Sequence, residues 1–296
     1  MKAFEKKLSG AVTSMDFKKR SVRIGYWLMI LVLVFVSAIC LFPPVWVLLS
    51  SFKDVSEFLQ VPPTIFPKSF HPEKIAYVWD MLNFGKYYMN SVYLAIGELV
   101  FCVVFNGLVG YVLSRLKPKG TTLILTLILW TMMLPTSVSM VPLFMSFVDV
   151  PYLHINLTNT FLPMWMMAGA NAFYVLLFKN FFDSIPMSYV EAARLDGCTN
   201  FGIFYRIILP LSKSIIMVVS IFSVNASWEN FFWPYLVLKD TNLYTVAVKI
   251  FQLKTTNFAI DEYMVVLLLS IIPPAVIFLI FQKYMMSDFA MGGVKG

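Results

Sequence analysis

The sequence has few charged residues for its length: Asp, Glu, Lys and Arg make up 13% of 296 residues, whereas 59% are apolar. Soluble domains carry roughly a quarter charged residues, so this chain cannot cover itself with a polar surface. Its apolar residues form continuous runs of about 18 to 26, and about 20 helical residues match the hydrocarbon core of a bilayer. The composition argues against a soluble domain and predicts a membrane protein.

Histidine and cysteine are also scarce. His71 and His154 lie in predicted outer loops, and Cys40, Cys102 and Cys198 are spread over two spans and one loop. This spacing predicts no metal site, no disulfide framework and no catalytic nucleophile–base pair within the spans. Nothing in the sequence matches G-x-x-x-x-G-K-[ST], so the chain is not expected to bind ATP phosphates itself.

The apolar runs predict an all-α integral membrane protein with about six spans. A spanning barrel would show short alternating segments, whereas continuous runs must satisfy their backbone groups as helices. The predicted spans are Gly25–Leu49, Met89–Leu113, Thr122–Phe147, Phe161–Phe178, Ser214–Leu236 and Tyr263–Phe281.

Lysine and arginine collect on alternate sides of these spans. The tail 1–24 carries seven, the loop 114–121 three, the loop 179–213 four and the C-terminal tail two, whereas the opposite loops share the remaining seven. Basic residues are retained in the cytoplasm, so both termini are predicted to be cytoplasmic. We expect a cytoplasmic tail 1–24, a membrane domain 25–286 and a cytoplasmic tail 287–296. The net charge of +7 then reflects topology, with no nucleic-acid partner expected.

The cytoplasmic loop 183–210 predicts two short helices. Ser184 is a candidate cap for a helix over Pro186–Asp196, and Gly197 suits the left-handed conformation that ends it. Thr199 is a candidate cap for a second helix to Ile207, which Pro210 would separate from the next span.

The first of these helices carries an unusual set of residues. Ala192 and Ala193 would keep one face thin enough for another surface to approach, and Glu191 offers a carboxylate. The pattern fits a helical projection that docks into a cleft; the alternative is an ordered loop without a partner.

The spacing of Glu191-Ala192-Ala193, Gly197 and Ile207-Ile208-Leu209-Pro210 resembles the EAA loop of binding-protein-dependent ABC importers. In that family the loop is a coupling helix seated in a cleft of the ATPase subunit. The resemblance implies that contact with an ATPase involves Glu191, Ala192, Ala193, Asp196, Gly197, Ile207, Leu209 and Pro210.

Two further segments resemble the MalG-type permeases of oligosaccharide import. They are Ser227–Pro234, in the fifth span, and the terminal Gly292-Gly293-Val294-Lys295-Gly296, which in that group reaches between the ATPase subunits. The resemblance implies a type I importer permease in a bacterial inner membrane. It also implies a homologous MalF-like second permease, two copies of an ATPase that holds ATP and magnesium, and an extracytoplasmic sugar-binding protein. No cofactor is expected in this chain.

The fifth span offers candidate substrate contacts in Asn225, Trp228, Glu229, Asn230 and Trp233. Carboxylate and amide groups suit sugar hydroxyls and aromatic rings suit the C–H face of a sugar, although helical spacing does not place all five on one face. The alternative is a tryptophan-rich anchor at the outer headgroups. Many relatives have Asn or Asp where Glu229 stands.

Other polar residues within spans leave alternatives open. Glu98 lacks an evident basic partner and is either a structural or a transport residue, and Asn106 and Asn171 suit hydrogen bonds between helices. An ion-coupled secondary transporter would need an intramembrane ionisable relay, for which Glu98 and Glu229 are the candidates. The proline-rich outer segment Ser51–Tyr88 is either a surface for a partner or a solvated loop.

Overall fold

The structure is a computed structural model that describes residues 20–256 and 258–292, with side chains through residue 282. Only helices and connecting loops occur among these residues. The first half contains α1 (Arg20–Ser50), α2 (Val55–Phe58), α3 (Glu73–Met81), α4 (Phe84–Phe101), η2 (Cys102–Asn106), α5 (Gly107–Tyr111), η3 (Val112–Leu116), α6 (Thr121–Met133) and α7 (Thr136–Val148). The second half contains α8 (Leu162–Gly169), α9 (Ala172–Ser184), α10 (Ser188–Leu195), α11 (Asn200–Ile203), η4 (Phe204–Ile208), α12 (Leu209–Leu211), α13 (Lys213–Glu229), α14 (Phe232–Val237), η5 (Thr241–Leu243), α15 (Val246–Lys254) and α16 (Ile260–Gly292).

Three helical stretches are long and apolar enough to cross a membrane without interruption: Arg20–Ser50, Phe84–Leu116 and Ile260–Gln282. They correspond to the predicted first, second and sixth spans. Two bent pairs raise the number of candidate spans to five, counted by length and composition. The all-helical membrane fold predicted from the sequence is confirmed.

The predicted third span is not one continuous helix. α6 and α7 meet at an angle of 105°, with the break at Leu134 and Pro135 in extended conformation. Proline has no N–H donor and restricts the residue before it to extended conformations, which explains the interruption. Sequence hydropathy registers the run of apolar residues but not the bend.

The predicted fourth and fifth spans are also interrupted. The fourth is divided into α8, of 8 residues, and α9, of 13 residues, at Ala170 and Asn171. At 1.5 Å per residue each half is shorter than the roughly 30 Å hydrocarbon core. The fifth ends as a helix at Glu229, and α14 begins after Asn230 and Phe231.

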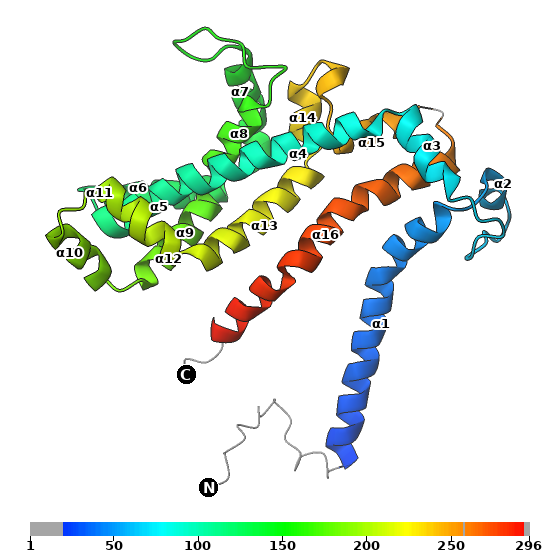
Figure 1. The fold of residues 1–296 in the computed structure, drawn as a ribbon, viewed down its shortest axis with the longest axis horizontal. Helices are drawn as coiled ribbons and strands as arrows, with labels where there is room; N and C mark the ends of the chain where they lie inside the picture. The colour runs from blue at the N-terminus through cyan, green and yellow to red at the C-terminus, as the bar shows by residue number, and fades with distance from the viewer. Residues whose placement is uncertain (1–19, 257, 293–296) are drawn as a thin grey trace.

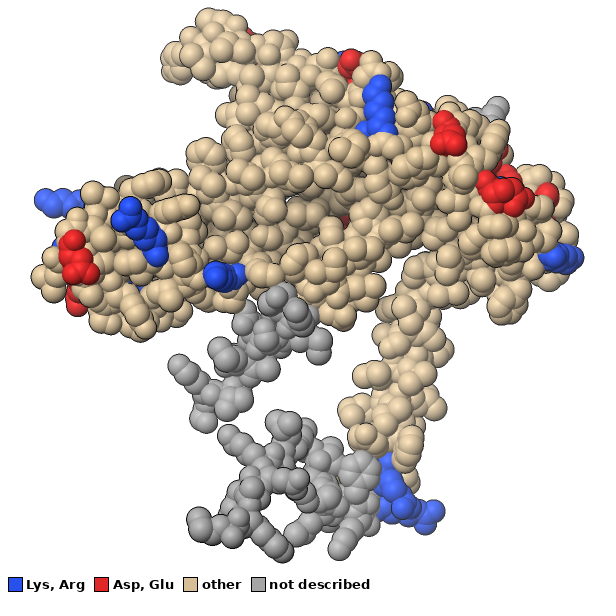
Figure 2. Space-filling model, in the orientation of Figure 1, with Lys and Arg blue, Asp and Glu red and all other residues tan. Residues whose placement is uncertain are grey.

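The helices form an elongated body from which α1 stands apart (Figure 1). In the most apolar stretch of α1, none of the residues are buried inside the chain. Figure 2 shows charged side chains around α10, around α2 and α3 and in the upper part of the view near α14, with a broad uncharged surface between α10 and the other two groups. This is the pattern of a lipid-facing belt.

Close packing at the α10 end depends on one glycine. A Cβ added at Gly110 of α5 would lie 2.8 Å from the Cβ of Phe178 and 3.0 Å from the backbone nitrogen of Lys179. α5 and α9 therefore approach more closely than a larger residue at this position allows. Buried side chains from α5, α9 and η4 form one core with α10, including Tyr111, Phe178, Phe182 and Phe204.

Candidate functional site

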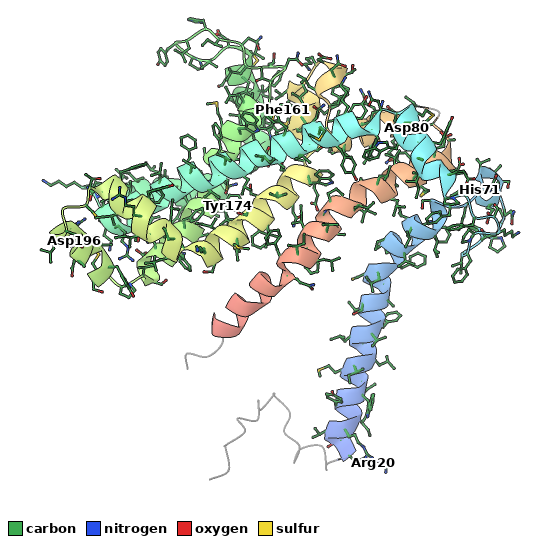
Figure 3. All side chains as sticks on the ribbon, in the orientation of Figure 1. Arg20, His71, Asp80, Phe161, Tyr174 and Asp196 are labelled. Atoms are coloured by element: carbon green, nitrogen blue, oxygen red, sulfur yellow. The ribbon has the colours of Figure 1, made fainter. Side chains whose placement is uncertain are left out.

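A compact helical knob, defined as residues 186–211, projects at one end of the body. Figure 3 labels Asp196 at its tip, at the opposite end from His71 in the outer segment. Gly197 has φ +77°, and Thr199 Oγ1 accepts a hydrogen bond from the backbone N–H of Gly202 at 3.1 Å. The predicted left-handed turn at Gly197 and the predicted cap at Thr199 are both confirmed.

The knob has a buried face and an exposed face. Val190, Ala193 and Ile203 are almost fully buried in the core that also contains Phe178 and Phe182. The opposite face exposes large apolar side chains together with charged ones. Its exposed residues include Tyr189, Glu191, Ala192, Arg194, Leu195, Asp196, Phe201 and Tyr205. Leu195 is 90% exposed, although the helix that carries it packs against the core through its other face.

Three details of the knob differ from the prediction. Ala193 faces the core at 4% exposure, so only Ala192 of the alanine pair lies on the open face. Ser184 does not cap α10 but ends α9, where its hydroxyl donates to the carbonyl oxygen of Phe181 at 2.7 Å. Pro210 does not end the second helix, because proline is tolerated in the first turn of α12; the chain bends by 80° after it, at Ser212.

The knob is fastened to the second span by side chains at the cytoplasmic end of that span. The guanidinium of Arg115, in η3, donates to the carbonyl oxygens of Phe182 and Ile185, which precede α10. The hydroxyl of Tyr111 donates to the carbonyl oxygen of Asn200 at 3.1 Å. These hydrogen bonds join the knob directly to the helical stretch Phe84–Leu116.

A second polar cluster holds the end of α9 beside the same span. Ser114 Oγ donates to Asp183 Oδ1 at 2.7 Å, and Lys179 Nζ lies 2.6 Å from Asp183 Oδ2. Burial alone would raise the pKa of the Asp183 carboxyl, but the hydrogen bonds from Lys179 and Ser114 hold it below its usual value. In the sequence, Arg115 counted only as one of the basic residues that indicate topology. Neither its hydrogen bonds nor the cluster around Asp183 was predicted.

Three π-helical segments occur at this junction: η2 and η3 in the second span and η4 in the knob. The Tyr111 and Phe204 rings, next to η3 and in η4, have centroids 5.1 Å apart. Single π-helical turns inside α-helices are frequent at functional positions, because the extra residue re-aims the side chains that follow.

A polar cavity of about 180 Å³ lies where the fourth and fifth spans are interrupted. Its polar lining comes from the second, fourth and fifth spans and consists of Glu98, Asn171, Tyr174, Ser223 and Asn230. Glu98 is 7% exposed and has no Lys or Arg within salt-bridge distance among the described residues. Carboxylate, amide and hydroxyl oxygens together make this cavity rich in hydrogen-bond acceptors.

The five candidate substrate residues of the fifth span do not share one cavity. Asn230 lines the polar cavity, whereas Trp228 and Glu229 line a larger groove of about 660 Å³ with Lys254. Trp233 faces a third hollow near Thr136 and packs edge-on against Phe147. The buried amide oxygen of Asn225 has no hydrogen-bond partner among the described residues.

The tryptophan-anchor alternative does not hold for Trp228. Its side chain is 8% exposed, and its Nε1 donates to the carbonyl oxygen of Ser270 in α16 at 3.0 Å. A headgroup anchor would present its ring to the lipid interface. Trp228 instead joins α13 to α16.

The two asparagines within spans supply hydrogen-bond partners to the backbone groups at the break in the fourth span. Asn106 Nδ2 donates to the carbonyl oxygen of Ala168 at 2.8 Å, and Asn106 Oδ1 accepts from the backbone N–H of Asn171 at 3.0 Å. Asn171 caps α9 by accepting from the N–H groups of Phe173 and Tyr174. The predicted role of Asn106 as a link between helices is confirmed, whereas Asn171 acts mainly as a cap.

Comparison with known proteins identifies the family. The model described as "Binding-protein-dependent transport system inner membrane component" matches residues 106–289, more than half of the chain. The arabinooligosaccharides transport system permease protein AraQ of Bacillus subtilis (strain 168) is 34% identical over 266 residues, covering 88% of this chain and 92% of that protein. AraQ of Halalkalibacterium halodurans is 28% identical over 285 residues, and the alignment covers 94% of this chain and 100% of that protein. The chain belongs to the family of inner-membrane components of binding-protein-dependent transport systems.

A solved structure shares the fold. One chain in the crystal structure of a bacterial ABC transporter involved in the import of the acidic polysaccharide alginate aligns with a TM-score of 0.78 and 22% identity. The alignment covers 90% of this chain and 98% of that chain. Together with the family match, this confirms the MalG-type permease fold predicted from the sequence, and the family places the chain in a membrane as one component of a transport system.

Proposed function

We propose that this chain is the permease subunit of an ATP-driven importer of oligosaccharides. The single observation that carries the proposal is the knob, whose apolar exposed face is not covered by any of the described residues although its opposite face packs tightly against the core. Family membership supports a transport role, and the arabino-oligosaccharide cargo named for the AraQ relatives supports the substrate class.

The exposed face of the knob is the proposed contact with an ATPase. Glu191, Ala192, Asp196 and Gly197 lie on or beside this face, next to the exposed Leu195. Apolar side chains rimmed by charges are typical of protein interfaces. Ile207 and Leu209 are half-buried and act by seating the knob, and Pro210 is exposed beside the bend that leads into α13.

Two ATPase copies, which hold ATP and magnesium, supply the energy in this proposal, because the sequence lacks a nucleotide-binding loop. A MalF-like second permease completes the pathway, and an extracytoplasmic sugar-binding protein delivers the cargo. The terminal Gly292 is the last residue of α16, whereas Gly293, Lys295 and Gly296, also expected at the ATPase interface, lie outside the described residues.

The polar cavity is the proposed substrate contact of this subunit. The second span and α9 line this cavity and also contact the knob. A displacement of the knob therefore reaches the cavity through both helices. Sugar hydroxyls donate hydrogen bonds, and Glu98, Asn171 and Asn230 offer acceptors. Asn225, Trp228, Glu229 and Trp233 are assigned to helix packing and to the neighbouring hollows.

The test is uptake by the assembled transporter in proteoliposomes. With its ATPase and binding protein present, the wild-type complex is expected to accumulate a labelled arabino-oligosaccharide when ATP is enclosed, with no loss on addition of proton and sodium ionophores. Glu191→Ala should lose both uptake and stimulated ATP hydrolysis. Uptake that needs no ATP and collapses with an ionophore would instead establish the ion-coupled alternative.

A further inference from the structure

An apolar loop in the outer segment is not covered by any other part of the chain that the structure describes. The loop, residues 59–66, follows α2 and exposes four large side chains: Leu59, Val61, Ile65 and Phe66. Their exposed fractions range from 58% for Ile65 to 96% for Val61. This is a cluster of neighbouring apolar groups rather than one scattered side chain, so it marks a contact surface.

The base of this loop is held firmly. The carboxylate of Glu57, 3% exposed, accepts hydrogen bonds from Thr64 Oγ1 and the backbone N–H of Lys68, both at 2.9 Å. It also accepts from the hydroxyl of Ser69 at 3.2 Å. Fastened on both sides, the loop keeps its apolar side chains outward instead of folding them against the protein.

One lysine sets the height of the loop relative to the membrane. Lys53 Nζ donates to the carbonyl oxygen of Thr64 and lies 4.3 Å from the centroid of the Trp46 ring in α1. Trp46 is four residues, about 6 Å, inside the outer end of α1. Thr64 and its neighbour Ile65 are therefore held level with the last full turn of a membrane-spanning helix.

The loop continues the lipid-facing surface of α1. Large aliphatic and aromatic side chains are exposed on all sides of α1, and Figure 1 shows the segment after α2 beside the outer end of that helix. Between Glu57 and Glu73 the only charged residue is Lys68. Tryptophan and lysine with apolar neighbours are the composition of the headgroup boundary.

We propose that residues 59–66 insert into the outer leaflet of the bilayer, with Leu59, Val61, Ile65 and Phe66 among the acyl chains nearest the headgroups. The loop then helps to fix the depth and tilt of α1, whose other contact with the body of the chain is its packing against α16. A binding protein or the second permease could also cover an apolar loop, and the experiment separates these occupants from lipid.

The experiment places an environment-sensitive fluorophore on the loop of the transporter assembled in phosphatidylcholine nanodiscs. Cys40 and Cys198 are replaced by serine, and the fully buried Cys102 is retained. Val61→Cys and, as a second site, Phe66→Cys are labelled separately. Tyr152→Cys is the matched control, because Tyr152 is 98% exposed in another outer loop.

Insertion predicts emission shifted to shorter wavelength at both loop sites. It also predicts that lipids with a nitroxide near the headgroup quench the fluorophore severalfold more strongly at the two loop sites than at Tyr152. Aqueous iodide should quench the loop sites more weakly than Tyr152. Strong iodide quenching at both loop sites would overturn the proposal in favour of a solvated loop. Shielding from both quenchers would overturn it in favour of a protein partner. Neither readout depends on transport, so the result stands apart from the proposed cargo.

Discussion

The guanidinium of Arg115 donates a hydrogen bond to the carbonyl oxygen of Phe182, joining the cytoplasmic end of the second span to the last turn of α9. A second donation, to the carbonyl oxygen of Ile185, reaches the turn that leads into α10. Arg115 is only 9% exposed. One side chain thus ties together the two helical lines that flank the polar cavity and the start of the knob.

Replacing Arg115 by methionine should lower both the stability of the complex and its coupling. The apolar stem is kept, but the carbonyl of Ile185 loses its side-chain donor, at a cost of about 1–3 kcal/mol for a buried group left unpaired, whereas the carbonyl of Phe182 keeps the backbone N–H of Ile185. We expect a lower thermal midpoint and less sugar imported per ATP hydrolysed. Arg23→Met, on the exposed first turn of α1 and away from the knob, is the control. An unchanged ratio of uptake to hydrolysis in the Arg115 variant would contradict a linking role.

Two glycines in cytoplasmic turns allow a matched test of the knob. Gly197 has φ +77° and Gly120 has φ +91°, and an added Cβ would meet no atom within 4 Å at either position. Alanine at each should therefore cost a similar amount, roughly 1–2 kcal/mol of backbone strain. Only Gly197→Ala, measured by ATPase stimulation and uptake, is expected to impair coupling. Equal losses in both variants would show that strain alone accounts for the effect.

The polar cavity predicts a selective effect at Glu98. Glu98→Gln keeps the shape of the side chain but replaces one carboxyl oxygen by an amide N–H₂ group, and a typical hydrogen bond contributes about 0.5–1.5 kcal/mol. The apparent KM for sugar should therefore rise by roughly threefold to tenfold, while basal ATP hydrolysis is retained. Glu229→Gln is the control, because Glu229 is exposed and lines the separate groove. The assignment fails if the two variants have the same KM.

The outer segment should respond to acid through Glu57. Burial would raise the pKa of this carboxyl, but hydrogen bonds from Lys68, Thr64 and Ser69 outweigh burial and lower the pKa to about 2. A lowered pKa in the folded state means that the stabilising contribution is complete above pH ~4.5 and is lost as the pH falls towards 2. The protection of the backbone amides in residues 57–69, taken relative to the intrinsic exchange rate at each pH, should therefore fall in that interval.

Glu57→Gln provides the check on this acid response. Glutamine cannot ionise, so the variant should show faster exchange at neutral pH and no further loss of protection specific to this interval. If the wild type and the variant respond to acid alike, Glu57 is not the group that titrates.

Local signals in the sequence predicted the turns of the knob. Gly197 and Thr199 act within a few residues, and their conformation and capping follow from backbone sterics and one short hydrogen bond. Ala193 was assigned to the wrong face because the face depends on how α10 packs against α9, which the sequence of α10 alone does not specify. Pro210 was misplaced as a terminator because proline is compatible with the first turn of α12.

Hydropathy located the spans but not their interruptions. The mean hydropathy of a window of apolar residues does not depend on whether the helix is continuous, as in Phe84–Leu116, or bent by 105°, as at Leu134 and Pro135. The polar cavity was missed for the same reason. Glu98 and Asn171 lie far apart in the sequence, and only the breaks near Asn171 and Asn230 bring them together.

The side chain of Asn106 accepts from Asn171 and donates to Ala168, so one amide completes the hydrogen bonding on both sides of the break between α8 and α9. An interruption satisfied in this way can flex without exposing bare peptide groups to lipid. α8 and α9 can therefore take different directions within the membrane while the backbone groups of Ala168 and Asn171 at the break keep their partners. A single side chain of the second span is enough to make a divided fourth span compatible with lipid.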